Sequence, residues 1–543
     1  MWQRSASRLT SYLVAAALCA AGGAVTPSAA PQSVVDVLSY RISLEFGAAD
    51  SAIRAVTEIT CQVSGDGTER VRFDLVGLIV DSVKVAGANA AFGKGVGSLE
   101  VELGERAAPG DTVVVAVFYH GNPEDGLIFR RNAYGRPAVF ADNWPDRARY
   151  WFPSVDHPRD KAMVEFRVRA PADWEVVASG RLVEEKLLDG DAKLTVWATE
   201  HPIPVYTMVF GAADLSVEEL GALGCEVGSD RCVRITQWVY PEDEEQARVL
   251  FRRAPEIVAF FDSLIGPFPY EKLALVQSST RYGGMENASA IFFGEGVVRR
   301  GRGDVVVAHE IAHQWFGDAV TEREWSHLWL AEGFATYFAS VFYEFHGDET
   351  LARRLRDSAE ARYLASPQDV ARPVIDSLPA NLMELLNANN YQKGAWVLQM
   401  LRQLLGDEMF FTGIRRYYAE YRHGTALTAD LQRVMEEVSG RELDWYFDQW
   451  LRRPGYPQVE TRHAWDAGEG TLELHVSQVQ SWPAYRLPLT LEAAGAGFSL
   501  RRTFWVEGSD SRHEWSLPAE PQRVRVDPDN EILGPVTVVG AID

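Results

Sequence analysis

Hydrophobic and polar positions divide the chain into three stretches with different periodicities. From about residue 36 to 240, apolar and polar residues alternate in short runs such as 112–119, 163–169 and 193–199. This alternation predicts β-strands, because successive side chains of a strand point to opposite faces. From about residue 241 the period lengthens to 3.6, which predicts helices over 245–265, 304–316, 328–345, 391–405 and 429–438. Strand patterns return after residue 455, over 471–476, 487–492 and 522–526.

This order of elements predicts an α+β multidomain protein. We expect an N-terminal β domain over 31–240, a mainly helical domain over 241–451 and a small C-terminal β-sandwich over 452–543. The length of 543 residues supports several domains, because a single hydrophobic core rarely grows beyond about 300 residues. Gly440 is expected to end the last predicted helix, since glycine readily adopts the left-handed conformation found at helix C-termini.

The first 30 residues carry the pattern of a secretory signal peptide. Arg4 and Arg8 precede an apolar run over 13–21, and small residues at 28–30 form a cleavage site. We therefore predict an exported protein, periplasmic or secreted, with a retained N-terminal membrane anchor as the alternative. The apolar run is too short to span a bilayer, and no later stretch is long enough either, so no transmembrane segment is predicted for the mature chain.

Charge and cysteine content narrow the possible partners. The chain has 53 basic and 76 acidic residues, and the resulting net charge of −23 disfavours a nucleic-acid partner. Four cysteines are too few for a disulfide-scaffold protein. Cys225 and Cys232 flank a Gly-Ser-Asp turn, and in an oxidising compartment they are plausible disulfide partners across a hairpin. Cys61 lies in an alternating strand pattern and is expected to be a buried free thiol.

A metal site is predicted in the helical region. His309 and His313 are four residues apart on a predicted helix, so both imidazoles lie on one face, with Glu310 between them. Glu332, on the next predicted helix, adds a carboxylate. Two histidines and a carboxylate form a catalytic zinc set that leaves one position for water. The same combination also suits iron, but two ligands on one helix around a glutamate favour hydrolytic zinc. One Zn²⁺ per chain is expected.

Three further motifs accompany this set. Gly283-Gly284-Met285-Glu286-Asn287 precedes the histidines, Tyr391-Gln392-Lys393-Gly394 follows Glu332, and a segment from Asn143 to Pro158 comes before them all. In order and spacing the motifs resemble those of the gluzincin aminopeptidases, the aminopeptidase N family, which also includes the leukotriene epoxide hydrolase. The resemblance covers roughly residues 130 to 457. It implies that the helical domain is a thermolysin-like catalytic domain.

The resemblance also implies a role for each motif. His309, His313 and Glu332 would hold zinc, Glu310 would act as general base, and Tyr391 would stabilise the oxyanion. Glu286 would pair with the free α-amine of a peptide and so select the first peptide bond. The other residues expected to bind or shape the substrate site are Gly283, Gly284, Met285 and Asn287, of which Asn287 would orient the loop.

Two positions depart from the family pattern. Trp144 stands where many members carry a glutamine or glutamate that helps to hold the amine, and Asp142, two residues earlier, is the candidate substitute. Ala331 stands where an asparagine often precedes the zinc-binding glutamate. His327 is expected to pack near Glu332 without binding the metal.

Together these observations predict a zinc-dependent aminopeptidase whose partners are peptides with a free N-terminus. Three alternatives remain at this point. The same zinc and tyrosine would also serve an epoxide hydrolase, an endopeptidase would need Glu286 not to block extended N-termini, and a catalytically silent binding module would need no chemistry at all. The intact catalytic set argues against the last of these.

Overall fold

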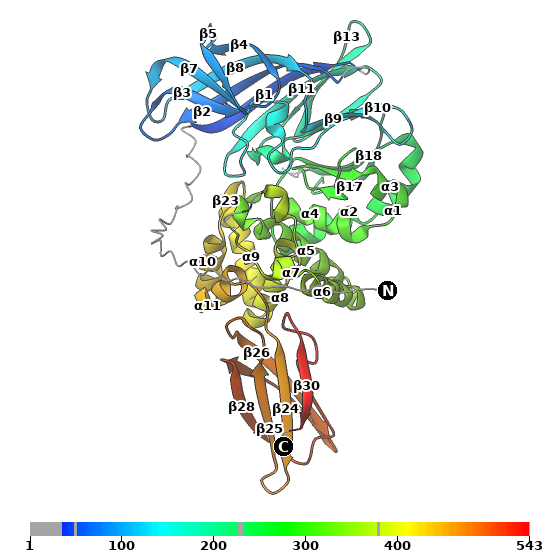
Figure 1. Cartoon of the computed structure of the whole chain (residues 1–543). Helices are drawn as coiled ribbons and strands as arrows, with labels where there is room; N and C mark the ends of the chain where they lie inside the picture. The colour runs from blue at the N-terminus through cyan, green and yellow to red at the C-terminus, as the bar shows by residue number, and fades with distance from the viewer. Residues whose placement is uncertain (1–34, 48–50, 226–231, 377–378, 380, 542–543) are drawn as a thin grey trace, which may run out of the picture. The chain divides into compact units, whose positions relative to one another are not determined.

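The structure is a computed structural model that describes residues 35–47, 51–225, 232–376, 379 and 381–541 (Figure 1). The predicted signal peptide over 1–30 lies outside the described residues. The described chain runs from a β-rich region through a mainly helical region to a second β region, in the order that the periodicity predicted. Within the described residues, no helix is long and apolar enough to cross a membrane.

The N-terminal region is built on a nine-stranded sheet with the order β13-β14-β11-β1-β2-β8-β4-β5, in which β15 also pairs with β11. The strand patterns expected at 112–119, 163–169 and 193–199 correspond to β8, β11 and β14. Inward-facing residues of β1 such as Ile42 and Leu44 are buried while their neighbours are not, which explains the alternation. The strands are β1 (Val35–Phe46), β2 (Ile53–Val63), β4 (Ile79–Val85), β5 (Ala88–Asn89), β8 (Thr112–Gly121), β11 (Lys161–Pro171), β13 (Arg181–Leu188), β14 (Ala192–Ala198) and β15 (Ile203–Pro204).

Two smaller sheets complete this region. One has the order β12-β16-β10-β9 and the other β3-β7-β6. Their strands are β3 (Thr68–Asp74), β6 (Phe92–Gly95), β7 (Ser98–Ala107), β9 (Leu127–Arg131), β10 (Pro137–Ala141), β12 (Glu175–Ala178) and β16 (Phe210–Ala213).

A five-stranded sheet with the order β17-β18-β19-β21-β20 packs against the first helices of the helical region. It takes strands from both sides of residue 240, where the domain boundary was expected, because β18 pairs in parallel with β19. The inner strands β19 and β21 are buried on both faces, so their sequences show no alternation and were not predicted. The sheet ends at β20. Its strands are β17 (Ser216–Leu223), β18 (Val233–Val239), β19 (Lys272–Ser278), β20 (Gly284–Met285) and β21 (Ala290–Gly294).

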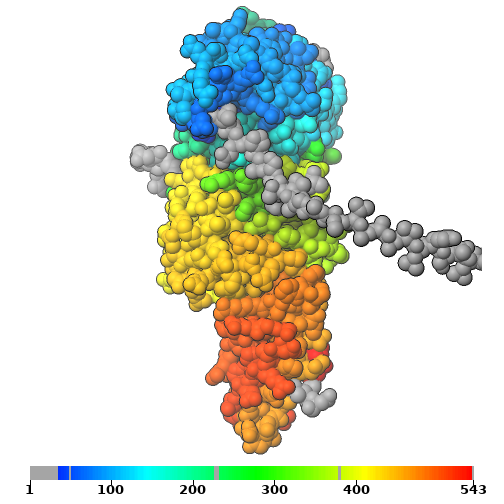
Figure 2. All heavy atoms as spheres, turned by 60° about the vertical axis from the view of Figure 1, so that its left-hand side comes forward, coloured from blue at the N-terminus to red at the C-terminus, as the bar shows by residue number. Residues whose placement is uncertain are grey.

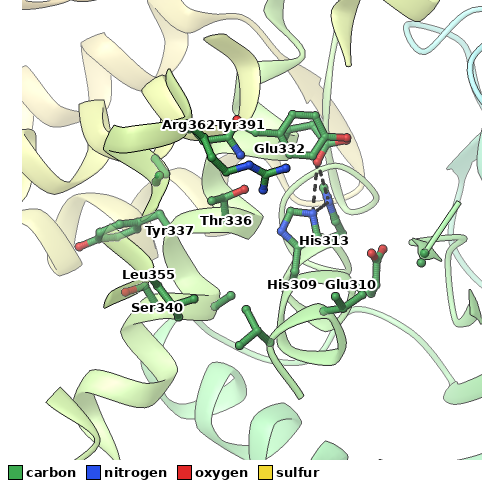
Figure 3. Close-up of a pocket in the computed structure, with 18 of the residues that line it drawn as sticks. His309, Glu310, His313, Glu332, Thr336, Tyr337, Ser340, Leu355, Arg362 and Tyr391 are labelled. Carbon is green, nitrogen blue, oxygen red and sulfur yellow. Dashed lines mark hydrogen bonds and ion pairs between the residues drawn. The ribbon is translucent and has the colours of Figure 1, made fainter. Parts of the chain in front are cut away.

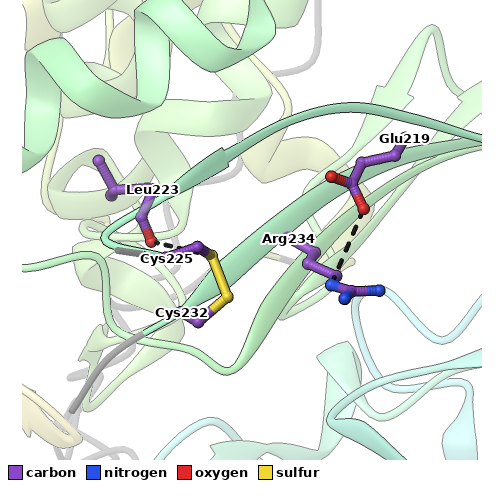
Figure 4. Close-up of a disulfide and its surroundings, with 5 residues drawn as sticks. All are labelled: Glu219, Leu223, Cys225, Cys232 and Arg234. Atoms are coloured by element: carbon purple, nitrogen blue, oxygen red, sulfur yellow. Dashed lines mark hydrogen bonds and ion pairs between the residues drawn. A yellow bond between two sulfur atoms is a disulfide. The ribbon is translucent and has the colours of Figure 1, made fainter. Parts of the chain in front are cut away.

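The hairpin of β17 and β18 carries a disulfide between Cys225 and Cys232 (Figure 4). The pairing suggested by the turn between them is therefore confirmed. Cys61 is buried and free, also as expected.

All five predicted helices have counterparts, two of which are divided, whereas α3, α6, α7, α9 and α11 were not predicted. The helix expected over 245–265 is two helices, α1 and α2, because Pro255 at the start of α2 lacks the N–H needed to continue α1. The helix predicted over 391–405 is also two elements, a π-helical turn (Asn389–Lys393) and α8. Gly440 ends α10 with φ of 66°, as expected. The helices are α1 (Glu244–Phe251), α2 (Ala254–Leu264), α3 (Glu295–Arg300), α4 (Asp304–His313), α5 (Trp329–Phe345), α6 (Glu349–Leu364), α7 (Pro367–Val370), α8 (Gly394–Leu405), α9 (Asp407–Tyr421), α10 (Thr428–Ser439) and α11 (Asp444–Phe447). A short two-stranded sheet pairs β22 (Val320–Glu322) with β23 (Gly424–Ala426).

The C-terminal region is a β-sandwich of a four-stranded sheet, β28-β25-β24-β30, and a three-stranded sheet, β27-β26-β29. It packs against the helical region, where the ring centroids of Tyr485 and Trp450 are 4.9 Å apart. Figure 2 draws the C-terminal region in orange to red and the end of the helical region in yellow. The strands are β24 (Val459–Asp466), β25 (Thr471–Gln478), β26 (Arg486–Gly495), β27 (Phe498–Glu507), β28 (Asp510–Ser516), β29 (Arg523–Val526) and β30 (Val536–Ala541).

Lys161 connects the N-terminal sheet to the helical region. Its Nζ donates hydrogen bonds to the carbonyl oxygens of Asp318 and Ala319, both at 2.9 Å, and of Gly424 at 3.1 Å. Asp318 and Ala319 lie in the turn that follows α4. One ammonium group from β11 thus satisfies three backbone acceptors of another domain, which would otherwise lack these bonds.

We predict that Lys161→Met destabilises the protein by about 1–3 kcal/mol, because polar groups left unpaired inside a protein carry a desolvation penalty of that order. The measurement is the urea midpoint followed by circular dichroism. Lys186→Met, which removes an exposed lysine from β13, is the matched control. Equal midpoints for the two variants would contradict the role given to Lys161.

Candidate metal centre

Two packed helices bring the three predicted ligands together. His309 and His313 lie on α4 and Glu332 lies on α5 (Figure 3). The two Nε2 atoms are 3.1 Å apart, and Glu332 Oε2 is 3.3 Å from His309 Nε2 and 3.2 Å from His313 Nε2. Three donor atoms from two elements therefore face one point, as the sequence predicted.

The surroundings orient these donors for a cation. The carbonyl oxygen of Phe316 is 3.1 Å from His313 Nδ1, so this nitrogen carries the proton and Nε2 is free to bind a metal. Burial alone would lower the pKa of His313, but the carboxylates around it, led by Glu332, raise it to about 10. A pocket that favours positive charge so strongly, and that offers two imidazole nitrogens and one carboxylate oxygen, fits a zinc ion.

Glu332 is fixed in its ionised form. Burial would raise its pKa, but His313 and His309 outweigh burial and hold the pKa below its usual range. The hydroxyl of Tyr391 donates a hydrogen bond of 2.6 Å to Glu332 Oε1, which leaves Oε2 directed at the two imidazoles. The ring of Tyr391 also stacks on His309, with centroids 6.1 Å apart and 7° between the planes.

Close backbone contact explains how Tyr391 reaches α5. Its π-helical turn lies beside Gly333 of α5, and a Cβ at Gly333 would lie 2.9 Å from Gly394. Because neither position carries a side chain, the turn and α5 approach to a distance that other residues would not allow.

Glu310 faces the same cavity from α4. It is 6% exposed, and burial raises its pKa well above the usual range, with the carboxylates of Glu286 and Glu332 adding to the shift. A Cβ at Gly284 would lie only 2.2 Å from Glu310 Oε1. The backbone of β20 therefore lies directly against Glu310, which requires glycine at this position.

Glu286 stands within reach of both Glu310 and His313. Ligand atoms of these three residues lie within 4.8 Å of one another. Burial raises the pKa of Glu286 to about 7, while His313 opposes this shift. An additional buried carboxylate next to the metal-binding residues is suited to bind a cationic group.

Gln314, which the sequence reasoning did not select, holds the loop after β20 against α4. Its Nε2 donates to the carbonyl oxygen of Glu286 at 2.6 Å and to Asp318 Oδ2 at 2.7 Å, and its Oε1 accepts from the backbone N–H of Ser289 at 2.8 Å. The sequence did hold one indication of this role, because Gln314 is a polar residue that directly follows His313 on a helix predicted to be buried. Asn287 is buried in the same loop, and its predicted orienting role remains a prediction.

A cavity of about 550 Å³ contains the site. Asp142, predicted as a second amine anchor, does not line it, since Asp142 is paired with Arg147 at 2.9 Å and Arg281 at 3.3 Å. Trp144 lines the cavity instead, with its ring against Tyr282. The predicted residues that line the cavity are Gly283, Gly284, Met285, Glu286, His309, Glu310, His313, Glu332 and Tyr391.

Two other predicted positions are structural. His327 Nδ1 is 2.8 Å from Thr428 Oγ1 and does not line the cavity, in agreement with a packing role. Ala331 is buried, and its Cβ would lie 3.3 Å from a Cβ at Gly317, in the turn after α4.

Two family models match the chain. Residues 37–207 match the Peptidase M1 N-terminal domain and residues 252–450 match the Peptidase family M1 domain, together more than half of the chain. Among curated proteins, the chain is 26% identical to the tricorn protease-interacting factor F2 of Thermoplasma acidophilum, over 88% of this chain and 57% of that protein. It is also 26% identical to the leucyl aminopeptidase of Saccharolobus solfataricus, over 85% of this chain and 59% of that protein. The chain thus spans less than two thirds of the length of these relatives.

A solved structure shares the fold. A mutant M1 zinc metallopeptidase from Deinococcus radiodurans, bound to a Tyr-Ser-Ala substrate, superposes with a TM-score of 0.68 at 23% identity. The match covers 77% of this chain and 94% of that one. The fold of this chain is therefore shared with a solved structure over most of its length.

We predict that His309→Ala loses bound metal. The change removes one of three ligand atoms from a site whose buried carboxylates favour a cation, so stoichiometric zinc in the wild-type protein should fall to a small fraction after dialysis. The measurement is metal content by inductively coupled plasma mass spectrometry. His475→Ala, in the C-terminal sheet, is the control that should keep its metal. Equal metal content in both variants would place the ion elsewhere.

Proposed function

This chain belongs to the Peptidase M1 family, and we propose that it is a zinc-dependent aminopeptidase that hydrolyses the first peptide bond of peptides with a free N-terminus. The observation that supports this best is the position of Glu286. This carboxylate is not among the three ligands, yet it lies within 4.8 Å of Glu310 and His313. A carboxylate at that distance can pair, in its ionised form, with the α-ammonium group at the end of a peptide.

His309, His313 and Glu332 would hold the zinc ion, which, when bound, would polarise the scissile carbonyl group and lower the pKa of water. The proton transfers would be carried out by residues of the chain. Glu310, whose pKa is raised by burial, is suited to take a proton from the attacking water and to return it to the leaving amine. The transfer needs a group whose pKa lies well above that of an exposed carboxyl.

Tyr391 and Glu286 would orient and stabilise the reacting group. The Tyr391 hydroxyl, which donates to Glu332, is placed to donate to an oxygen that gains negative charge. Glu286 would hold the α-amine, so only the bond one residue away would lie over the ligands.

We predict that Glu310→Gln lowers turnover of aminoacyl aminomethylcoumarin substrates by about 100- to 10,000-fold, the usual contribution of a general base, while zinc content stays unchanged. Chelation of the metal should abolish turnover, and zinc should restore it. N-acetylation of a peptide substrate should block cleavage, because Glu286 would lose its cationic partner. Equal cleavage of acetylated and free peptides would instead indicate an endopeptidase.

We also propose that the protein is exported, to the periplasm or the medium, with residues 1–30 removed. The basic, apolar and small-residue pattern of residues 1–30 supports export. The Cys225–Cys232 disulfide supports an oxidising compartment.

We predict that the native protein, isolated from the extracytoplasmic fraction, begins after residue 30 and alkylates at one thiol when denatured without reductant. Reduction should expose two more thiols, because Cys225 and Cys232 are bonded while Cys61 is free. N-terminal sequencing and intact mass are the measurements. Four reactive thiols without reductant, in protein from the cytoplasmic fraction that still carries Cys19, would be the opposite result.

A further inference from the structure

Arg362 is a cavity-lining cation that the proposed mechanism does not use. It lies on α6 and lines the same cavity as the metal ligands. Figure 3 shows its guanidinium beside Tyr391 and Thr336, extended toward the ligand cluster. α6 packs against α5 and against the π-helical turn of Tyr391, whereas β20, which precedes Glu286, packs against α4. Arg362 and Glu286 therefore approach the ligands from different elements.

The charge of Arg362 has no partner in the described part of the chain. Arg356, the other arginine of the cavity wall, lies 3.5 Å from Glu344. Arg147 and Arg281, which do not line the cavity, are paired with Asp142. Arg362 has no side-chain hydrogen bond or ion pair to the described residues. Its guanidinium offers five N–H donors in a planar fork that matches a carboxylate.

The cavity is thus polarised. Glu286 offers negative charge beside the ligands, and Arg362 offers an unpaired positive charge on the wall formed by α6. The volume of about 550 Å³ is that of a site for a small ligand and would hold only a short stretch of peptide. A molecule that satisfies both charges has an ammonium group at one end and a carboxylate at or near the other.

We propose that Arg362 binds a carboxylate of the substrate beyond the scissile bond, so the preferred substrates are short peptides with such a carboxylate within reach. This inference rests on the proposed aminopeptidase function. The carboxylate comes either from the C-terminus of a di- or tripeptide or from an aspartate or glutamate side chain. Arg362 is then a residue that determines specificity for peptide length or for acidic residues.

The experiment measures kcat/KM for matched substrate pairs. Trialanine and trialanine amide differ only in the C-terminal carboxylate, while Ala-Asp-Ala amide and Ala-Asn-Ala amide differ only in a side-chain carboxylate. We expect the wild type to prefer the acidic member of at least one pair by about 10-fold or more, the usual effect of a charge-assisted bidentate contact. Which pair shows the preference identifies the source of the carboxylate.

Arg362→Gln should reduce that preference to nearly one, and Arg362→Lys should restore it in part. Arg354→Gln, which removes an arginine of α6 that does not line the cavity, should keep the wild-type ratio. No preference in either pair, or an unchanged ratio in Arg362→Gln, would overturn the proposal. A uniform loss of rate leaves the ratio unchanged and therefore counts against it.

A binding measurement separates this proposal from the proposed function. Calorimetric titration of the zinc-loaded Glu310→Gln protein with trialanine, trialanine amide and the Asp and Asn amides needs no turnover. Tighter binding of an acidic member that depends on Arg362 would support the carboxylate site even if the wild type cleaved none of these peptides. Equal binding of both members of each pair would overturn it even in an active aminopeptidase.

Discussion

The structure depends on the burial of several carboxylates at one place. Glu286, Glu310 and Glu332 are each about 5–6% exposed and lie around two histidines, an arrangement that repels itself unless a cation is present. The protein does not relieve this repulsion by spreading the groups apart. Instead α4, α5 and the loop after β20 are fixed against each other, so the carboxylates stay close together. Because a bound cation relieves their repulsion, the cluster has a high affinity for positive charge.

Close approach between backbones makes this arrangement possible. Gly284 lets β20 lie against Glu310, and Gly333 with Gly394 lets the Tyr391 turn lie against α5. A methyl group at Gly284 would displace the Glu310 carboxyl, and one at Gly333 would separate α5 from the Tyr391 turn. Gln314 then ties the loop to α4 through two hydrogen bonds and donates a third to Asp318 in the turn after α4, which Lys161 also holds from another domain. The site is thus supported on several sides by polar contacts that contribute no chemistry.

Much of this site could be predicted because its chemistry is local in sequence. The spacing of His309 and His313 on one helix determines that both imidazoles face the same way, and the periodicity of the sequence predicted the two helices, α4 and α5, that carry the three ligands. Strands β19 and β21 were not visible, because complete burial removes the alternation that identifies a strand. Asp142 shows a different limit. Its place beside Trp144 suggested a second anchor for the substrate amine, but Arg147 and Arg281, of which Arg281 is distant in sequence, pair with its two carboxylate oxygens. Partners brought together by the fold cannot be read from spacing.

The position of β20 limits the thickness of any chain that could pair with this strand. A strand at the end of a sheet presents unpaired backbone groups and is ordinarily a hazard, because another chain can extend the sheet there. In this protein the terminal strand lies in the wall of a cavity, next to Glu310, and only Gly284 and Met285 form it. A folded protein cannot bring a sheet edge into such a space. If the proposed function is right, the place of β20 in this wall would select a substrate by its thickness before any side chain is recognised, and would favour a single extended strand.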